Sequence, residues 1–175
     1  MIRHAWQCLP SASPLTGEKT IGTGVLKYPT HSFTTDANGS YTVSGLEWDT
    51  YASALTNAAY DLAGTSLMPV FDVNAGENKA VQMIVTPHLD KALLVSVVDG
   101  NGAAIDGALV VLQKTPFSDT KTTNGGTCAT PGQVFWNGLA SGTYSLTVSK
   151  TGYATSVTSV SLSSSWQNPT ITLAP

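Results

Sequence analysis

Charged residues are scarce in this chain. Asp, Glu, Lys and Arg make up 11% of its 175 residues, well below the roughly 25% that is usual for a globular protein. Arg3 is the single arginine, and the formal net charge is −3. A surface that binds nucleic acid or anionic lipid needs clustered Lys and Arg. We therefore expect neither nucleic-acid binding nor membrane contact by this segment.

Long hydrophobic runs are also missing. The longest, Ala92–Val98, is interrupted by Ser96 and is far too short to span a bilayer. The first residues, Met1–His4, are not followed by the apolar segment of a signal peptide. Because the composition nevertheless has an exported character, low in charge and rich in Thr and Ser, we expect a fragment of a longer exported protein.

Catalytic groups are few and scattered. The three histidines are His4, His31 and His88, and neither His nor Glu occurs after His88. A catalytic nucleophile needs a base within hydrogen-bond reach, and no such pattern is readable, so we expect no enzyme activity and no cofactor. The stretch Asp36–Ser40 superficially resembles the start of a calcium loop. We interpret it as a hairpin turn whose Asp caps its own backbone, and we predict no metal site.

The chain has only two cysteines, Cys8 and Cys128. Neither has a second soft ligand at zinc-binding spacing, so a zinc site is not predicted. In an oxidising compartment the two thiols are expected to pair as a disulfide. The alternative is two unrelated thiols.

What the sequence does contain is an internal repeat. Residues 45–51 and 138–144 both read Gly-Leu-x-x-x-Thr-Tyr, an offset of 93, and Tyr60 and Tyr153 follow at the same offset. Residues 35–39 align with 122–126 at an offset of 87, which leaves residues 127–132, with Cys128, as a six-residue insertion. Such a repeat predicts two tandem modules, 1–87 and 88–175.

Strand signals dominate both modules. In the second, apolar Tyr144, Leu146 and Val148 alternate with polar residues, the period of a half-buried strand. We predict strands at 93–98, 108–114, 133–137, 143–149, 157–163 and 170–173 in module 2, and around 41–43, 51 and 81–85 in module 1. Asn-Gly occurs four times and favours tight hairpins. The predicted fold is all-β, with two tandem β-sandwiches and essentially no helix. Tyr51 and Tyr144 should be equivalent and buried.

Module 2 carries several recognisable motifs. They are Gly-x-x-Ile-Asp-Gly-Ala-Leu-Val at 102–110, Thr-x-Asn-Gly at 122–125, the repeated stretch at 138–144, and Lys-Thr-Gly-Tyr at 150–153. Together they resemble the carboxypeptidase regulatory-like domain, a small transthyretin-like (Ig-like) β-sandwich. Module 1 resembles it from about Thr34 onward.

That resemblance implies a non-catalytic module. Modules of this kind resemble those on the exposed ends of bacterial pilin-like and other surface proteins. The implied role is an extracellular, cell-surface structural or display module pair of a bacterial surface or pilus-like protein. Neighbouring subunits of a surface assembly would be its partners.

Two tryptophans are candidate binding residues. Trp48 and Trp166 lie in predicted loops, and an exposed indole face can stack on a sugar ring or a protein partner. The alternative is that each fills the end of a sandwich, because tryptophan is usually well buried. The competing function is therefore an adhesion module that binds a surface glycan or a partner.

The start of module 1 lacks a recognisable first strand within residues 1–33. Trp6–Leu9 is a possible substitute, followed by a predicted loop at 10–24. An absent strand leaves a sheet edge unpaired. Either Trp6–Leu9 closes that edge, or a neighbouring subunit donates a strand to it.

Overall fold

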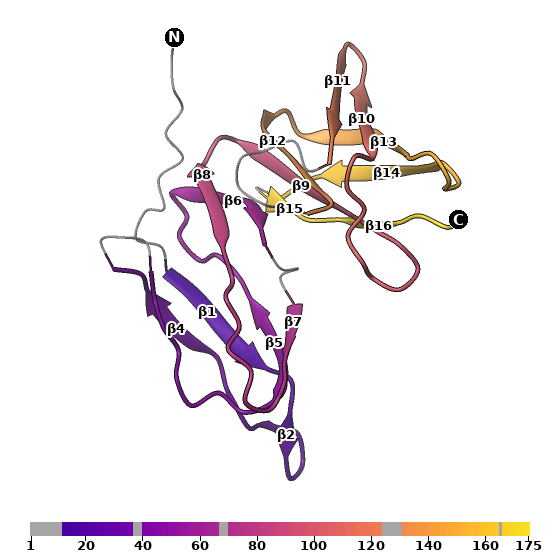
Figure 1. The fold of residues 1–175 in the computed structure, drawn as a ribbon. Helices are drawn as coiled ribbons and strands as arrows, with labels where there is room; N and C mark the ends of the chain where they lie inside the picture. Colours follow the sequence, from indigo (N-terminus) through magenta and orange to yellow (C-terminus); the bar gives the residue numbers. More distant parts are fainter. Residues whose placement is uncertain (1–11, 37–39, 67–69, 124–130, 165) are drawn as a thin grey trace. The chain divides into compact units, whose positions relative to one another are not determined.

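The computed structural model describes residues 12–36, 40–66, 70–123, 131–164 and 166–175. The chain divides into two compact units, Met1–Thr86 (unit 1) and Pro87–Pro175 (unit 2), each described here by itself. Every regular element among the described residues is a strand (Figure 1). In that part of the chain no helix is long and apolar enough to cross a membrane. The prediction of an all-β fold is confirmed.

Unit 2 is built from two sheets. Its strands are β9 (Lys91–Val98), β10 (Leu109–Lys114), β11 (Phe117–Thr122), β12 (Gln133–Leu139), β13 (Gly142–Ser149), β14 (Ser156–Leu162), β15 (Trp166–Gln167) and β16 (Thr170–Thr172). One sheet has the order β11-β10-β13-β14 and is antiparallel throughout. The other has the order β12-β9-β15, and β16 also pairs with β9. The two sheets enclose one core, which makes unit 2 a β-sandwich.

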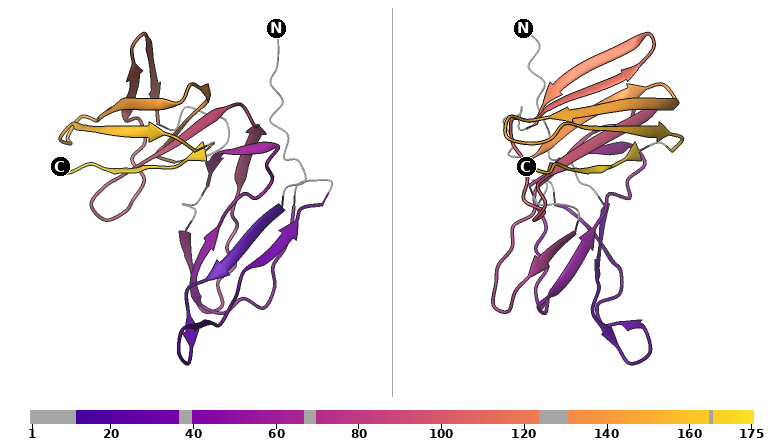
Figure 2. Two further views of the ribbon diagram at one scale, coloured as in Figure 1. Left: turned by 180° about the vertical axis from the view of Figure 1, so that it is seen from behind. Right: turned by 90° about the vertical axis from the view of Figure 1, so that its right-hand side faces the viewer.

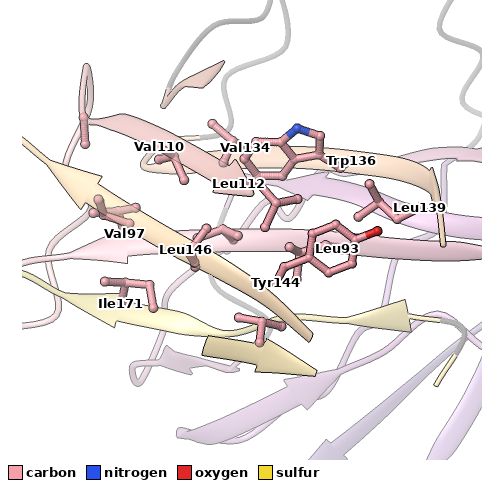
Figure 3. Packing of buried hydrophobic residues seen from close by; sticks show 14 of the residues in the cluster. Leu93, Val97, Val110, Leu112, Val134, Trp136, Leu139, Tyr144, Leu146 and Ile171 are labelled. Atoms are coloured by element: carbon pink, nitrogen blue, oxygen red, sulfur yellow. The ribbon is translucent and has the colours of Figure 1, made fainter. Parts of the chain in front are cut away.

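The core of unit 2 draws side chains from both sheets. Leu93 and Trp136 come from the sheet around β9, and Leu112, Tyr144 and Leu146 come from the sheet around β10 and β13 (Figure 3). Each of these residues is at most 4% exposed. Full burial of such a side chain contributes roughly 1.5–3 kcal/mol. The burial of these side chains is therefore the main stabilisation of unit 2.

Unit 1 contains one four-stranded sheet. Its strands are β1 (Ala12–Gly17), β2 (Thr20–Ile21), β3 (Val25–Leu26), β4 (His31–Thr34), β5 (Asp49–Ser53), β6 (Tyr60–Thr65), β7 (Val70–Val73) and β8 (Met83–Pro87). The sheet has the order β4-β1-β5-β7, while β2 pairs with β3 and β6 with β8. The β2–β3 hairpin extends beyond the end of the sheet in each view (Figures 1 and 2). The core is small and centres on Leu15, Tyr51 and Val73.

All six strands predicted for unit 2 are present. Those at 93–98, 108–114, 133–137, 143–149, 157–163 and 170–173 correspond to β9, β10, β12, β13, β14 and β16. The prediction missed β11 and β15. Strand β11 reads Phe-Ser-Asp-Thr-Lys-Thr and lies at a sheet edge, exposed or half-exposed throughout. It therefore has no buried face to leave a period-two pattern.

The loop predicted at 10–24 is wrong, because it contains β1 and β2. Pro14, Gly17, Gly22 and Gly24 gave that stretch the composition of a turn. Strand β1 instead lies between β4 and β5, even though a proline in a central strand removes a ladder hydrogen bond. Burial of Leu15, which is 5% exposed, outweighs the local signals.

The strand predicted around 41–43 is also wrong, because residues 40–48 form no strand. Tyr41 stacks on Phe33 with ring centroids 4.6 Å apart, and Val43 packs against the small core. Residues 40–46 are the repeat equivalents of β12 at the offset of 93. The same apolar pattern is thus used for side-chain packing in unit 1 and for strand pairing in unit 2.

Strand β1 lies within residues 1–33, where no first strand of module 1 was recognisable in the sequence. It lies between β4 and β5, as β10 lies between β11 and β13. By position β1 is therefore the counterpart of β10, not of the first strand β9. Trp6–Leu9 lies outside the described residues, so internal closure and strand donation by a neighbour both stay predictions.

Candidate functional site

The repeated Gly-Leu-x-x-x-Thr-Tyr stretch makes the same contact in both units. The hydroxyl of Tyr51 donates to the carbonyl of Glu47 at 3.0 Å, and that of Tyr144 donates to the carbonyl of Ala140 at 2.9 Å. Both tyrosines are buried, at 1% and 2% exposure, as predicted. Glu47 and Ala140 are repeat equivalents, so each tyrosine ties down the turn before its own strand. This arrangement is similar to the tyrosine corner of immunoglobulin-like sandwiches.

The Tyr51 corner makes stability depend on pH. Burial raises the pKa of Tyr51 above 10.0, and Asp49 and Tyr28 raise it further. The folded state thus holds this proton more tightly than the unfolded chain does. Its contribution is fully present below the unfolded pKa of about 10 and is lost as pH rises through the folded pKa.

We expect the free energy of unfolding of unit 1 to fall above about pH 10, and Tyr51→Phe to reduce that fall. Denaturant titrations between about pH 8 and 11 measure it. Tyr41→Phe is the matched control, because Tyr41 is 55% exposed. An unchanged pH slope in Tyr51→Phe would contradict the prediction.

Trp48 is the most exposed of the described tryptophans, at 62%. The ammonium of Lys19 lies 3.1 Å from the centroid of its ring and donates to the Trp48 carbonyl at 2.6 Å. The backbone amide of Lys19 donates to both carboxylate oxygens of Asp49 at 3.0 Å. The backbone of Lys19 is therefore held by Asp49 and its ammonium by Trp48. A cation–π contact covers one face of the indole.

An ion pair also lies beside Trp48. Lys27 and Glu47 form an ion pair at 2.5 Å on the surface. The hydrogen bond from Lys27 lowers the pKa of Glu47, although an exposed pair of this kind contributes little to stability. Lys19, Lys27, Glu47, Trp48 and Asp49 together form what we call the Trp48 cluster. It is an aromatic surface with balanced charges, suited to a polar partner.

Trp166 occupies a different setting. It begins β15, where its register partner is Ala92 of β9, and its carbonyl accepts a hydrogen bond from Ser164 Oγ at 3.0 Å. Its side chain is half-buried, and it belongs to a sheet, not to the predicted loop. Trp48 lies in unit 1 and Trp166 in unit 2.

The predicted disulfide between Cys8 and Cys128 lies outside the described residues and stays a prediction. Asp36 and Ser40 are the described ends of the stretch interpreted as a turn, and two hydrogen bonds join them. Oδ1 of Asp36 accepts the amide of Ser40 at 2.9 Å, and the amide of Asp36 donates to the Ser40 carbonyl at 2.9 Å. No group of three or more His, Cys, Asp or Glu in the described part of the chain is placed to hold a metal ion.

Sequence reasoning missed a polar cluster in unit 2. Nε1 of Trp136 donates to Asp119 Oδ2 at 2.7 Å, and the ammonium of Lys121 donates to the Phe135 carbonyl at 2.6 Å. Burial lowers the pKa of Lys121, and Asp119 offsets part of that effect. The two charged residues are two apart on β11, so they share a strand face. Recognising β11 as a strand would have revealed them.

The first and last strands of unit 2 run side by side. β15 and β16 both pair with β9 in parallel, with register pairs at Ala92–Trp166 and Leu93–Gln167, then at Ser96–Thr170, Val97–Ile171 and Val98–Thr172. We call this the terminal seam. The amide of Ser96 donates to the Pro169 carbonyl at 3.1 Å, and the amide of Leu173 donates to the Val98 carbonyl at 2.9 Å. The seam therefore extends along nearly all of β9.

Unit 2 is similar in sequence to a known domain family. Residues 92–174 match the family model of the carboxypeptidase regulatory-like domain. The resemblance of unit 2 to this domain, drawn from its motifs, is confirmed. A tandem pair of such domains is not established by this match, which stops short of unit 1. No curated protein matches the chain.

Solved structures give weaker similarities over the whole chain. A minor pilin of Streptococcus agalactiae is 15% identical, with 96% of this chain and 84% of that chain covered and a TM-score of 0.39. A streptococcal ancillary pilin is 16% identical, with 94% and 57% covered and a TM-score of 0.38. The shaft pilin of Lactobacillus rhamnosus is 13% identical, with 95% and 85% covered and a TM-score of 0.37. At such TM-scores the similarities do not establish a shared two-unit arrangement.

Proposed function

We propose that this chain is a non-catalytic, extracellular module pair that extends or displays other parts of a bacterial surface or pilus-like protein. The observation that carries the proposal is the path of the chain through unit 2. It enters at Lys91, the start of β9, and leaves at Thr172, which pairs with Val98 at the far end of β9 (Figure 1). Entry and exit are therefore about 25 Å apart along the strand.

This path is what a spacer requires. The termini of many domains lie close together, and such a domain adds little length when it is inserted in a chain. In unit 2 the parallel pairing of the first and last strands forces the ends to opposite sides. Each such module lengthens the chain by about one strand. The low charge and the Thr- and Ser-rich composition suit a module exposed to solvent, and neighbouring subunits are the proposed partners.

The proposal is tested on intact cells that produce the protein. We expect an antibody raised against the whole chain to label intact cells, and added protease to remove the signal without lysis. A cytoplasmic protein serves as the control for leakage. Labelling that appears only after lysis would overturn the surface location.

The competing function is an adhesion module that binds a glycan or partner, and the exposure of Trp48 favours it. Against a stacked sugar stands Lys19, whose ammonium already covers one indole face. A glycan array with the whole chain, with Trp48→Ala and Trp166→Ala as comparisons, separates the two functions. Binding that is lost in Trp48→Ala would establish adhesion, and the spacer proposal expects no binding.

A further inference from the structure

We infer that unit 2 bears tensile load through the terminal seam, which acts as a shear clamp between β9 and the β15–β16 segment. The inference deepens the proposed function and rests on it for the source of the load. A spacer between an anchored and a displayed part is pulled at its two ends. The resistance itself follows from the topology of unit 2 alone.

The direction of pulling decides how the seam is loaded. A force on the chain before Lys91 draws β9 backward along its own axis, and a force after Thr172 draws β16 forward. Because the two strands are parallel and paired, these forces act along the strands in opposite directions. The interstrand hydrogen bonds lie across the strands, so they are strained together. Separation then requires most of them to break in one step.

The groups on both sides of the seam are well held. β9 is also paired on its other side with β12, through Val95–Val134 and neighbouring pairs. On the terminal side, Ile171 and Leu173 are buried in the core of the sandwich. A sliding β16 would have to pull both side chains out of that core while its hydrogen bonds break. The core and the seam therefore resist the same displacement.

Side-chain contacts lie across the seam as well. The hydroxyl of Ser96, which is buried, lies 3.3 Å from Asn168 Oδ1. This contact lies where β15 ends and β16 has not yet begun, so it bridges the interval between the two runs of backbone pairing. Lys91 at the start of β9 donates to the Ser163 carbonyl at 3.4 Å. The segment before β15 is thus tied to the entry end of β9.

A single-molecule experiment on the whole chain tests the clamp by changing only the direction of force. In the first geometry, handles are attached at position 89, just before β9, and at the C-terminus. In the second, they are attached at position 101 and at the C-terminus. Asn101 is exposed and lies in the turn after β9, shortly beyond Val98, the register partner of Thr172. The second geometry peels β16 away from Val98, one hydrogen bond after another.

We expect the rupture force to be severalfold higher in the first geometry than in the second at the same loading rate. Forced unfolding is governed by the unfolding barrier, so the difference reports the barrier along each direction and not the equilibrium stability, which is common to both. Equal rupture forces in the two geometries would overturn the inference.

A matched pair of mild variants locates the resistance. Ser96→Ala removes the contact across the seam, and Ser159→Ala makes the same change on the exposed side of β14. We expect Ser96→Ala to lower the rupture force in the first geometry only, and Ser159→Ala to change neither. An equal effect of both variants would contradict the assignment to the seam. The rupture-force experiment uses purified protein, so its result does not depend on where the protein lies in the cell. If the protein resisted shear but were absent from the cell surface, the proposed function would be wrong and the shear clamp would stand.

Discussion

Tyr144→Ala is expected to unfold unit 2, and Tyr51→Ala is expected to unfold unit 1. Each substitution removes a fully buried aromatic ring together with the hydrogen bond that holds the turn before its strand. Loss of a buried aromatic side chain costs about 3–5 kcal/mol, a large share of the 5–15 kcal/mol that a folded domain has in total. Unit 1 should be the more sensitive, because its described core centres on only three buried residues.

Phenylalanine at the same positions separates the loss of the buried ring from the loss of the hydrogen bond to the turn. Tyr144→Phe keeps the ring and leaves the Ala140 carbonyl without its donor, which should cost about 1 kcal/mol. Amide hydrogen exchange, read by peptide for residues 1–86 and 87–175, shows which unit loses protection. If Tyr144→Ala removed protection equally from both ranges, the chain would unfold as one cooperative body and the two-module organisation would be wrong.

Gly132→Ala is expected to lower the stability of unit 2 by about 3 kcal/mol. Gly132 has a φ of +66°, and a Cβ there would lie 2.6 Å from the Val97 carbonyl oxygen and 3.0 Å from the Ala104 Cβ. That carbonyl cannot retreat easily, since it accepts the amide of Ile105 at 2.9 Å. Gly132 itself accepts the amide of Val97 at 2.7 Å, so the clash acts directly on β9.

Gly138→Ala is the matched control for this substitution. Its φ is also +66°, but no atom lies within 4 Å of the position its Cβ would take. It should therefore show only the cost of the left-handed backbone, about 1 kcal/mol. Thermal or urea unfolding of the two variants beside the wild type measures the cost of the left-handed backbone and the added cost of the close contact at position 132. Similar losses in the two variants would show that the close approach to Val97 is not what demands glycine at position 132.

The sequence by itself determined the local character of this protein. Alternation in Tyr144–Val148 predicts a strand and which of its faces is buried, because neighbouring side chains point to opposite faces. The repeat at an offset of 93 predicted that Tyr51 and Tyr144 are equivalent, and both make the same hydrogen bond four residues back. These features depend on residues close together in the chain.

Only the tertiary structure decided which segments lie beside one another. Period-two alternation says nothing about a strand's neighbours, so neither the parallel pairing of β9 with β16 nor the place of β1 between β4 and β5 was predictable. Strand β11 is held by β10 through backbone hydrogen bonds and carries no apolar face. The contact between Trp48 and Lys19 likewise joins residues 29 positions apart, and the exposure of Trp48 was not predictable either. Such contacts form because the folded chain brings distant segments together and satisfies their backbone groups, a condition that no local pattern records.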